Sequence, residues 1–201
     1  MAYFPMFVDI TGQKCLIVGG GRVAKRKVQV LLDFGARVVL VAKEISDDIK
    51  EIASEKSEDG NISLHEKEFE DTDIEGAMIV VVATGDKKLN DHIYALCREK
   101  RIPINVVDVK EMCSFIFPSY VREGNLVGAF SSSGNSPVLA KYLKDKTSFF
   151  LTKDLGELNE YLGQLRPQVI ERIKDEPGRK AYYEKILEEY LKDPAGFDIK
   201  K

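Results

Sequence analysis

The segment from Cys15 to Ala24, which reads CLIVGGGRVA, constrains the fold more than any other part of the sequence. An apolar run ends in three glycines, and a helical pattern of apolar and basic residues follows. This order is typical of the strand, glycine turn and helix of a dinucleotide-binding βαβ unit. There, Gly19 permits the tight turn, Gly21 lets the backbone approach a diphosphate, and the small Ala24 lets helix and strand pack closely. We expect the diphosphate to bind the free N–H groups of the helix that begins near Arg22.

Strand-like and helical segments alternate over the first half of the chain. The expected strands are Leu16–Val18, Arg37–Ala42, Ile62–His65, Ala77–Ala83 and Pro103–Val107. The expected helices are Val23–Phe34, closed by Gly35, Ser46–Ser54, with Ser46 as N-cap, and Lys88–Lys100. Alternation at this spacing predicts an α/β protein with a Rossmann-type, doubly wound parallel sheet.

The pattern changes after Asp108. Two strand-like runs with no helix between them predict an antiparallel hairpin of Ser114–Pro118 and Leu126–Ser131, joined by Tyr120–Asn125. Ser136 and Pro137 then open a helical region, for which we expect Val138–Phe150, Leu155–Lys174 and Arg179–Leu191. The predicted domains are a nucleotide-binding domain over 1–112, a hairpin and helix region over 113–150 and a C-terminal helical domain over 151–201.

The composition is that of an ordinary globular protein, with 44% apolar and 31% charged residues. No apolar run is long enough to span a membrane, and the N-terminus does not have the pattern of a signal peptide. The three cysteines are widely spaced, which favours reduced thiols in the cytoplasm. A net charge of −3 argues against nucleic acid as the main partner. His65 and His92 share no ligand spacing with a cysteine or another histidine, so we expect no tight zinc site.

Asp108 is the candidate for acid–base chemistry, because it directly follows a strand of a parallel sheet, where such folds bind ligands. A carboxylate there acts as a general base when a proton lies within reach. Many aspartates after strands only cap a turn, and position alone leaves both interpretations open.

The loop from Ser131 to Pro137 is rich in hydroxyl groups and leads into a helix. Simple capping requires only Ser136 and Pro137, so the additional polar residues favour a loop that binds carboxylate or phosphate groups. The candidate substrate contacts are Ser131, Ser132, Ser133, Asn135 and the nearby Lys141. The basic clusters at 25–27 and 141–146 are typical of solvated helix faces, although they would suit a polyanionic substrate.

Lys43 and Glu44 follow the second expected strand, close to the position at which NAD-binding folds place an acidic residue on the ribose hydroxyls. Glu44 would favour NAD, whereas Lys43 would favour the 2′-phosphate of NADP. We prefer NAD.

The chain resembles the precorrin-2 dehydrogenase family, which includes the N-terminal part of multifunctional siroheme synthases. The resemblance extends from Pro5 to about Tyr183. It rests on motifs in a fixed order: FPMFV at 4–8, the glycine segment at 15–24, VAT at 82–84, NVVD at 105–108, SFIFPS at 114–119, and the loop at 131–140 with NSPVLA. The chain departs from many relatives at Gly85, where they carry Asp or Asn.

The resemblance implies an NAD-dependent oxidation of precorrin-2 to sirohydrochlorin by a homodimer. Asp108 matches the catalytic aspartate of the family, and Ser132 matches a serine that is phosphorylated in some relatives. The cofactor contacts that the resemblance implies are Arg22, Val23, Lys43 and Glu44. Gly19, Gly21 and Thr84 are further candidates for cofactor binding. Some family members also insert iron into sirohydrochlorin, so ferrous ion is a further candidate substrate.

Two other functions fit the same residues. One is a dehydrogenase of another small substrate, and the other is a module that senses NAD without turnover. A sensor would need neither Asp108 nor the serine loop.

Overall fold

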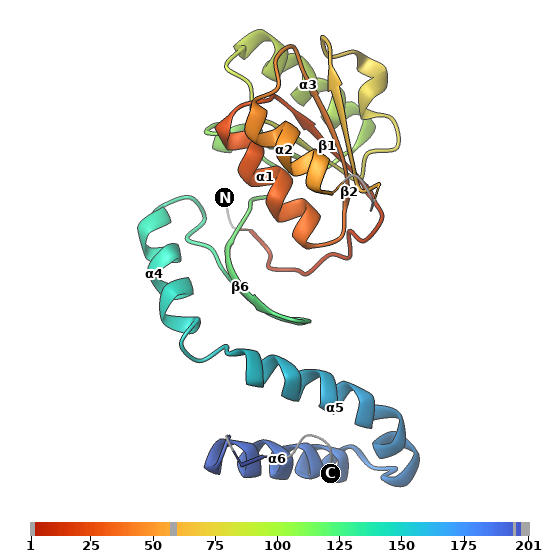
Figure 1. Ribbon diagram of the computed structural model, residues 1–201, viewed down its shortest axis with the longest axis vertical. Helices are drawn as coiled ribbons and strands as arrows, with labels where there is room; N and C mark the ends of the chain where they lie inside the picture. Colours follow the sequence, from red (N-terminus) through yellow and green to blue (C-terminus); the bar gives the residue numbers. More distant parts are fainter. Residues whose placement is uncertain (1–2, 57–59, 195, 198–201) are drawn as a thin grey trace. The chain divides into compact units, whose positions relative to one another are not determined.

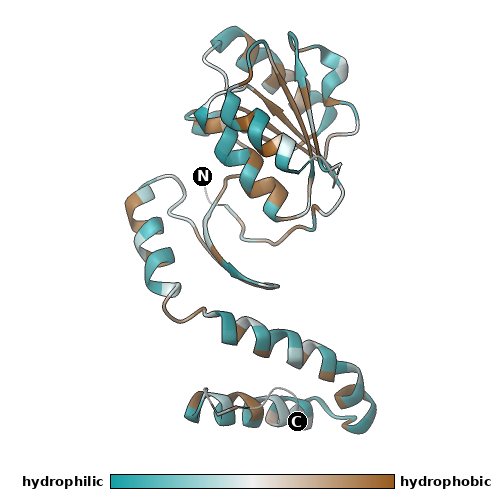
Figure 2. Ribbon diagram, in the orientation of Figure 1, coloured by the Kyte–Doolittle hydropathy of each residue, from teal (hydrophilic) through white to brown (hydrophobic). Residues whose placement is uncertain are grey.

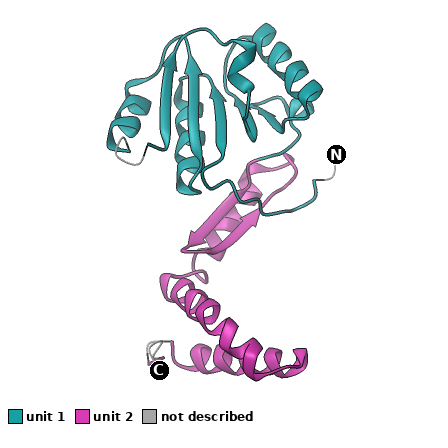
Figure 3. Cartoon of the chain, turned by 90° about the vertical axis from the view of Figure 1, so that its right-hand side faces the viewer, with its two compact units in different colours: residues 1–116 teal, residues 117–201 magenta. Residues whose placement is uncertain are grey.

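The computed structural model describes residues 3–56, 60–194 and 196–197. These residues form two compact units, 1–116 and 117–201 (Figure 3). The predicted domain limits of 1–112, 113–150 and 151–201 stay a prediction.

The first unit contains a five-stranded parallel sheet with the strand order β3-β2-β1-β4-β5. Its strands are β1 (Lys14–Val18), β2 (Arg37–Ala42), β3 (Ile62–Glu66), β4 (Ile79–Val82) and β5 (Ile104–Val106). The chain order reverses between β1 and β4, as it does in a Rossmann fold. The predicted fold class is confirmed.

Helices connect these parallel strands (Figure 1). They are α1 (Arg22–Asp33), α2 (Asp47–Glu55), the short 3₁₀ helix η2 (Asp71–Ile74) and α3 (Lys87–Lys100). A second 3₁₀ helix, η3 (Lys110–Met112), follows the last parallel strand, β5. The positions predicted for α1, α2 and α3 agree closely with these bounds. Both η2 and η3 are too short to produce a periodic apolar pattern, so the sequence does not predict them.

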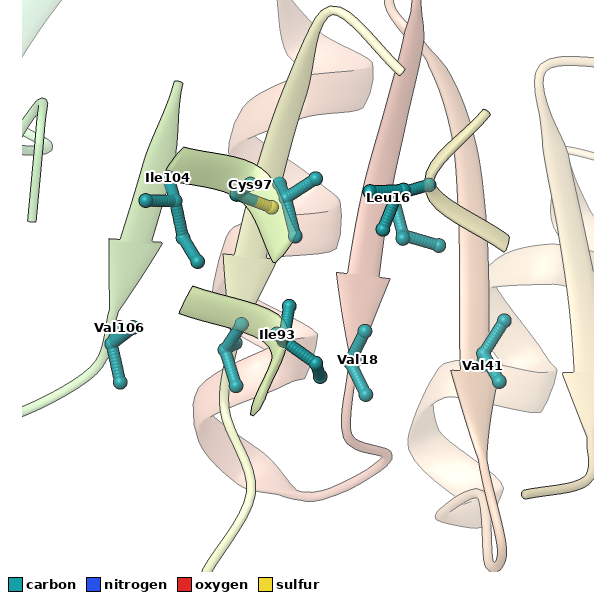
Figure 4. Packing of buried hydrophobic residues seen from close by; sticks show 10 residues of the cluster. Leu16, Val18, Val41, Ile93, Cys97, Ile104 and Val106 are labelled. Carbon is teal, nitrogen blue, oxygen red and sulfur yellow. The ribbon is translucent and has the colours of Figure 1, made fainter. Parts of the chain in front are cut away.

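The hydrophobic core lies on both faces of the sheet. Alternate strand residues point to opposite faces; on one face Leu16 and Val18 pack against Ile93 and Cys97 of α3, while α1 passes behind the sheet (Figure 4). β1, β2 and β4 are apolar almost throughout, whereas the helices are mostly hydrophilic on their outer surfaces (Figure 2). This distribution is typical of a parallel sheet covered by helices.

The predicted cap at the end of α1 is present, whereas the predicted cap at the start of α2 makes no side-chain hydrogen bond. Gly35 has a φ of 73°, and the N–H groups of Gly35 and Ala36 donate to the carbonyls of Leu32 and Leu31. This arrangement confirms that Gly35 closes α1. Ser46 is the N-cap of α2 by position, but its hydroxyl makes no capping hydrogen bond.

The hairpin of the second unit is confirmed, but the predicted position of its first strand is wrong. The strands are β6 (Ser119–Glu123) and β7 (Leu126–Phe130), joined at Gly124 and Asn125. Residues 114–118 form no strand of this hairpin, because Ser114 is hydrogen-bonded to Ile104 of β5 in the first unit.

Three helices complete the second unit: α4 (Pro137–Thr147), α5 (Lys153–Arg172) and α6 (Glu176–Lys192). Ser136 accepts a hydrogen bond from the N–H of Leu139, which confirms it as the N-cap of α4. α4 ends at Thr147, before the predicted Phe150. Within the described part of the chain, no helix has both the length and the apolar character required to cross a bilayer.

Candidate functional site

The carboxyl ends of the five parallel strands meet at one edge of the sheet, and most predicted site residues follow directly from them. β1 leads into the glycine turn, β2 into Lys43 and Glu44, β4 into Thr84, and β5 into Asp108. The reversal of strand order between β1 and β4 places a crevice at this edge in folds of this class. The first unit by itself therefore brings together the candidate cofactor residues and the candidate base.

Two glycines of the turn are required by close backbone approaches. Gly19 has a φ of 119°, and a Cβ atom there would lie 2.4 Å from the carbonyl oxygen of Ala83. A Cβ atom on Gly20 would lie 2.1 Å from the carbonyl oxygen of Glu44. The turn after β1 thus packs closely against the backbone of the loops after β2 and β4. Sequence reasoning assigned roles to Gly19 and Gly21 but missed Gly20.

Gly21 is different, because among the described residues only its own chain neighbours have atoms within 4 Å of the position that its Cβ would take. It is the N-cap of α1 and carries no capping side chain, and the first turn of α1 has no acidic residue. The positive end of the helix dipole is therefore left without a counter-charge from these positions. Arg22 and Val23 are exposed in the first turn. This open, uncapped helix end fits the diphosphate of a dinucleotide.

Lys43 is exposed and forms an ion pair with Glu68, at 2.8 Å between Nζ and Oε1. The hydrogen bond that Lys43 donates to the Glu68 carboxylate raises the pKa of Lys43. Glu44 is also exposed at the end of β2. Glu68 therefore belongs to the surroundings of the candidate ribose site, and sequence reasoning missed it because it follows β3 rather than β2.

Thr84 is engaged in a local hydrogen-bond network. Its hydroxyl lies 2.5 Å from Oδ1 of Asn90, and Nδ2 of Asn90 donates to the Thr84 carbonyl at 3.2 Å. Asn90 is buried in α3. These contacts hold the loop after β4 against α3, so the loop that supports Gly19 is itself anchored.

Asp108 lies in the turn after β5 with a φ of 62°, in the left-handed region. Its side chain is exposed. Among the described residues, no hydrogen bond or ion pair engages its carboxylate. Asp108 therefore does not cap its own turn by any bond seen here, and its carboxylate is available to a ligand.

The basic residues of α1 have separate environments. Lys25 forms an ion pair with Asp48 of α2 at 2.9 Å. Lys27 is half-buried, and this burial lowers its pKa. Neither Lys25 nor Lys27 therefore lies on a fully solvated helix face.

The predicted substrate loop lies in the second unit. The hydroxyl of Ser131 accepts from the N–H of Ser133, and that of Ser132 accepts from the N–H of Ser136. Ser133 has a φ of 54°. Asn135 donates its N–H to the carbonyl of Ser132, and Lys141 pairs with Asp145 on α4. The loop is thus organised by its own hydroxyl groups.

A cavity of about 400 Å³ also lies in the second unit, between residues of α5, α6 and the segment after α6. Its lining includes Tyr161, Tyr182, Lys185 and Glu189, and none of the predicted site residues. Across the described ranges, no cluster of three or more His, Cys, Asp or Glu side chains is arranged to hold a metal ion.

Fold and site together define a Rossmann-type dinucleotide-binding protein. Residues 6–119 match the family described as "Putative NAD(P)-binding". The chain belongs to this NAD(P)-binding family.

The relatives agree with this assignment. The chain is 35% identical over 188 residues to a siroheme synthase of Nitrosococcus oceani, a match that covers 94% of this chain and 39% of the relative. It is 37% identical over 185 residues to a siroheme synthase of Neisseria meningitidis, covering 92% of this chain and 38% of the relative. The chain thus spans less than half the length of these curated relatives.

A solved structure described as SirC, precorrin-2 dehydrogenase, has the same fold. It superimposes with a TM-score of 0.69 at 25% identity, covering 95% of this chain and 90% of SirC. These matches confirm the resemblance predicted from the motifs.

Proposed function

We propose that this chain is an NAD-dependent dehydrogenase that oxidises precorrin-2 to sirohydrochlorin. One observation carries the proposal: an uncapped, open helix end at Gly21 lies at the same edge of one parallel sheet as the Asp108 carboxylate, which no bond engages among the described residues. The extended match to SirC, precorrin-2 dehydrogenase, supports the substrate.

The residues of the first unit fit NAD. The N–H groups at the start of α1 bind the diphosphate, and Gly21 leaves room for its approach. Glu44 binds the ribose hydroxyls at the end of β2, and Lys43 is occupied by Glu68. When bound, NAD supplies the acceptor for the hydride that the substrate loses.

Asp108 acts as the general base in this proposal. Oxidation removes two hydrogens from the macrocycle, one as a hydride and the other as a proton, and the Asp108 carboxylate takes the proton. β4 separates β1 from β5 in the sheet, so the usual strand spacing places their ends roughly 10 Å apart. A reactant bound over the end of β4 would lie within reach of both the glycine turn after β1 and the Asp108 carboxylate after β5.

The second unit provides the candidate contacts for the carboxylates of the substrate. Ser131, Ser132, Ser133 and Asn135 form a polar loop before α4, and Lys141 lies one helical turn after Pro137. We assign these side chains to substrate binding because a tetrapyrrole with several carboxylates requires hydroxyl, amide and ammonium donors.

A homodimer and a cytoplasmic location complete the proposal. Large apolar side chains are exposed on and after α4, including Val138 and Phe149, and a second copy would cover them. Three free cysteines, two of them buried, suit a reducing compartment.

The test is to incubate the protein with precorrin-2 and NAD and to follow both the tetrapyrrole spectrum and NADH absorbance. We expect conversion to sirohydrochlorin with equimolar NADH. Asp108→Asn keeps the size of the side chain and removes its basicity, so we expect turnover to fall by about 100-fold or more with unchanged NAD affinity.

Three outcomes would contradict parts of this proposal. NAD binding without any spectral change would favour a sensor. Loss of NAD binding in the Asp108→Asn variant would contradict the assignment of Asp108 as the general base. NADH formation with another small substrate, but not with precorrin-2, would overturn the assignment of precorrin-2 as the substrate. A further arm with ferrous ion and sirohydrochlorin tests iron insertion.

A further inference from the structure

The segment after η3 is attached to the outer edge of β5. The N–H of Ser114 donates to the carbonyl of Ile104 at 2.8 Å, and the N–H of Ile104 donates to the Ser114 hydroxyl at 2.8 Å. β5 is the last strand in the sheet order. Ser114 therefore satisfies the N–H and the carbonyl of Ile104 on an otherwise open strand edge, and it fixes the neighbouring Cys113 beside β5.

This attachment brings the thiol of Cys113 to the turn that carries Asp108. Sγ of Cys113 lies 3.2 Å from the carbonyl oxygen of Val106 and 3.3 Å from that of Val109. These two carbonyls flank Asp108 along the chain. The one thiol proton, shared between the two oxygens, ties the start of the turn to its end.

Asn105 holds the thiol from the other side. Its side chain is only 8% exposed, and its Nδ2 donates to the carbonyl of Phe115 at 3.0 Å and to Sγ of Cys113 at 3.4 Å. Both amide protons are thereby used, as a buried amide requires. The thiol is an acceptor from Asn105 and a donor to the turn.

The backbone of Asp108 needs such support. A φ of 62° is uncommon for a residue with a side chain, although aspartate tolerates it better than most. Conformations of this kind persist where the surrounding structure holds them. Because no bond within the described residues restrains the carboxylate, its direction depends on the turn.

We propose that Cys113 and Asn105 are positioning residues that hold the Asp108 turn and thereby fix the direction of its carboxylate. This inference rests on the proposed function, in which Asp108 is the base. Burial raises the pKa of the Cys113 thiol, so at neutral pH the thiol keeps the proton that the bridge requires.

The test compares Cys113→Ala with Cys113→Ser in the full chain. Alanine removes the bridge, and we expect kcat to fall on the order of 10-fold, with KM for precorrin-2 and the Kd for NAD within about twofold of the parent. Serine retains an O–H donor, so kcat should recover to within about threefold of the parent. Asn105→Ala should show the same split between kcat and KM.

Cys97→Ala is the matched control, because this thiol of α3 is buried among apolar residues of the sheet. We expect it to lower the melting temperature and to leave kcat unchanged. The inference is overturned if Cys113→Ala turns over like the parent, if serine fails to rescue it, or if kcat merely follows the melting temperature in all variants. Absence of turnover in the parent overturns the proposed function instead, and the inference with it.

Discussion

At the scale of single residues, the candidate ribose site is defined by charges from two neighbouring strands. Lys43 follows β2 and is paired with Glu68, which follows β3. The proximity of Asp86 also helps to raise the pKa of Lys43. A cation held by carboxylates is a poor partner for the 2′-phosphate that distinguishes NADP from NAD.

We therefore expect Glu68→Gln to relax the cofactor preference. Releasing Lys43 from its ion pair should strengthen NADP binding by about fivefold and leave NAD binding unchanged, since an exposed pair contributes at most about 1 kcal/mol. Titration of both dinucleotides by fluorescence measures the change. Glu70→Gln is the control of equal charge, because Glu70 pairs with Lys67 instead. An equal gain in both variants would show only a general effect of net charge.

At the scale of elements, the strands and helices of the first unit enclose two thiols. Cys15 of β1 and Cys97 of α3 are both fully buried. Burial raises the pKa of each from 9.0 to about 11. The folded state therefore holds protons that the unfolded chain releases near pH 9.

This difference predicts a loss of stability in alkali. As the pH rises from about 9 to about 11, the unfolded state binds fewer protons than the folded state, so the free energy of unfolding decreases, by on the order of 2 kcal/mol per thiol. Urea unfolding at a series of pH values measures this decrease in the free energy of unfolding. In the double variant Cys15→Ala/Cys97→Ala the alkaline slope should be shallower, although the variant is less stable at pH 7. Parallel slopes in parent and variant would contradict this assignment, because lysines and tyrosines titrate in both.

At the scale of the whole molecule, the exposed apolar side chains of the second unit are the feature that a monomer does not explain. Val138 is 78% exposed and Phe149 is 76% exposed. Exposed apolar residues on one helix and directly after it are typical of an interaction surface, and the proposed homodimer would bury them.

We expect Phe149→Asp to shift the protein from dimer to monomer. A buried phenylalanine contributes about 2–3 kcal/mol, and a two-fold interface loses it twice, so the dimer Kd should rise by at least about 100-fold. Sedimentation velocity over a range of concentrations measures the shift. Leu191→Asp alters an exposed apolar residue at the end of α6 and should leave the dimer intact. A parent protein that sediments as a monomer would refute the homodimer.

Local patterns in the sequence were sufficient to predict the parallel sheet, the helices α1, α2 and α3, and the capping roles of Gly35 and Ser136. Apolar runs, helical periodicity and cap residues are properties of neighbouring residues, so they can be read along the chain. The wrong placement of the first hairpin strand has a non-local cause, because Ser114 is hydrogen-bonded to Ile104 and is not available to the hairpin. No pattern within residues 114–118 indicates the contact between Ser114 and Ile104.

The same division holds for the site. The glycine turn and Asp108 follow from the order of residues, because the ends of parallel strands must meet at one edge. The crowding of Gly20 by Glu44, the pairing of Lys43 with Glu68, and the bridge from Cys113 across the Asp108 turn were decided by tertiary structure. Each of these contacts joins loops that come together only when separate strands align, so their distances depend on the register of the sheet and not on the local sequence.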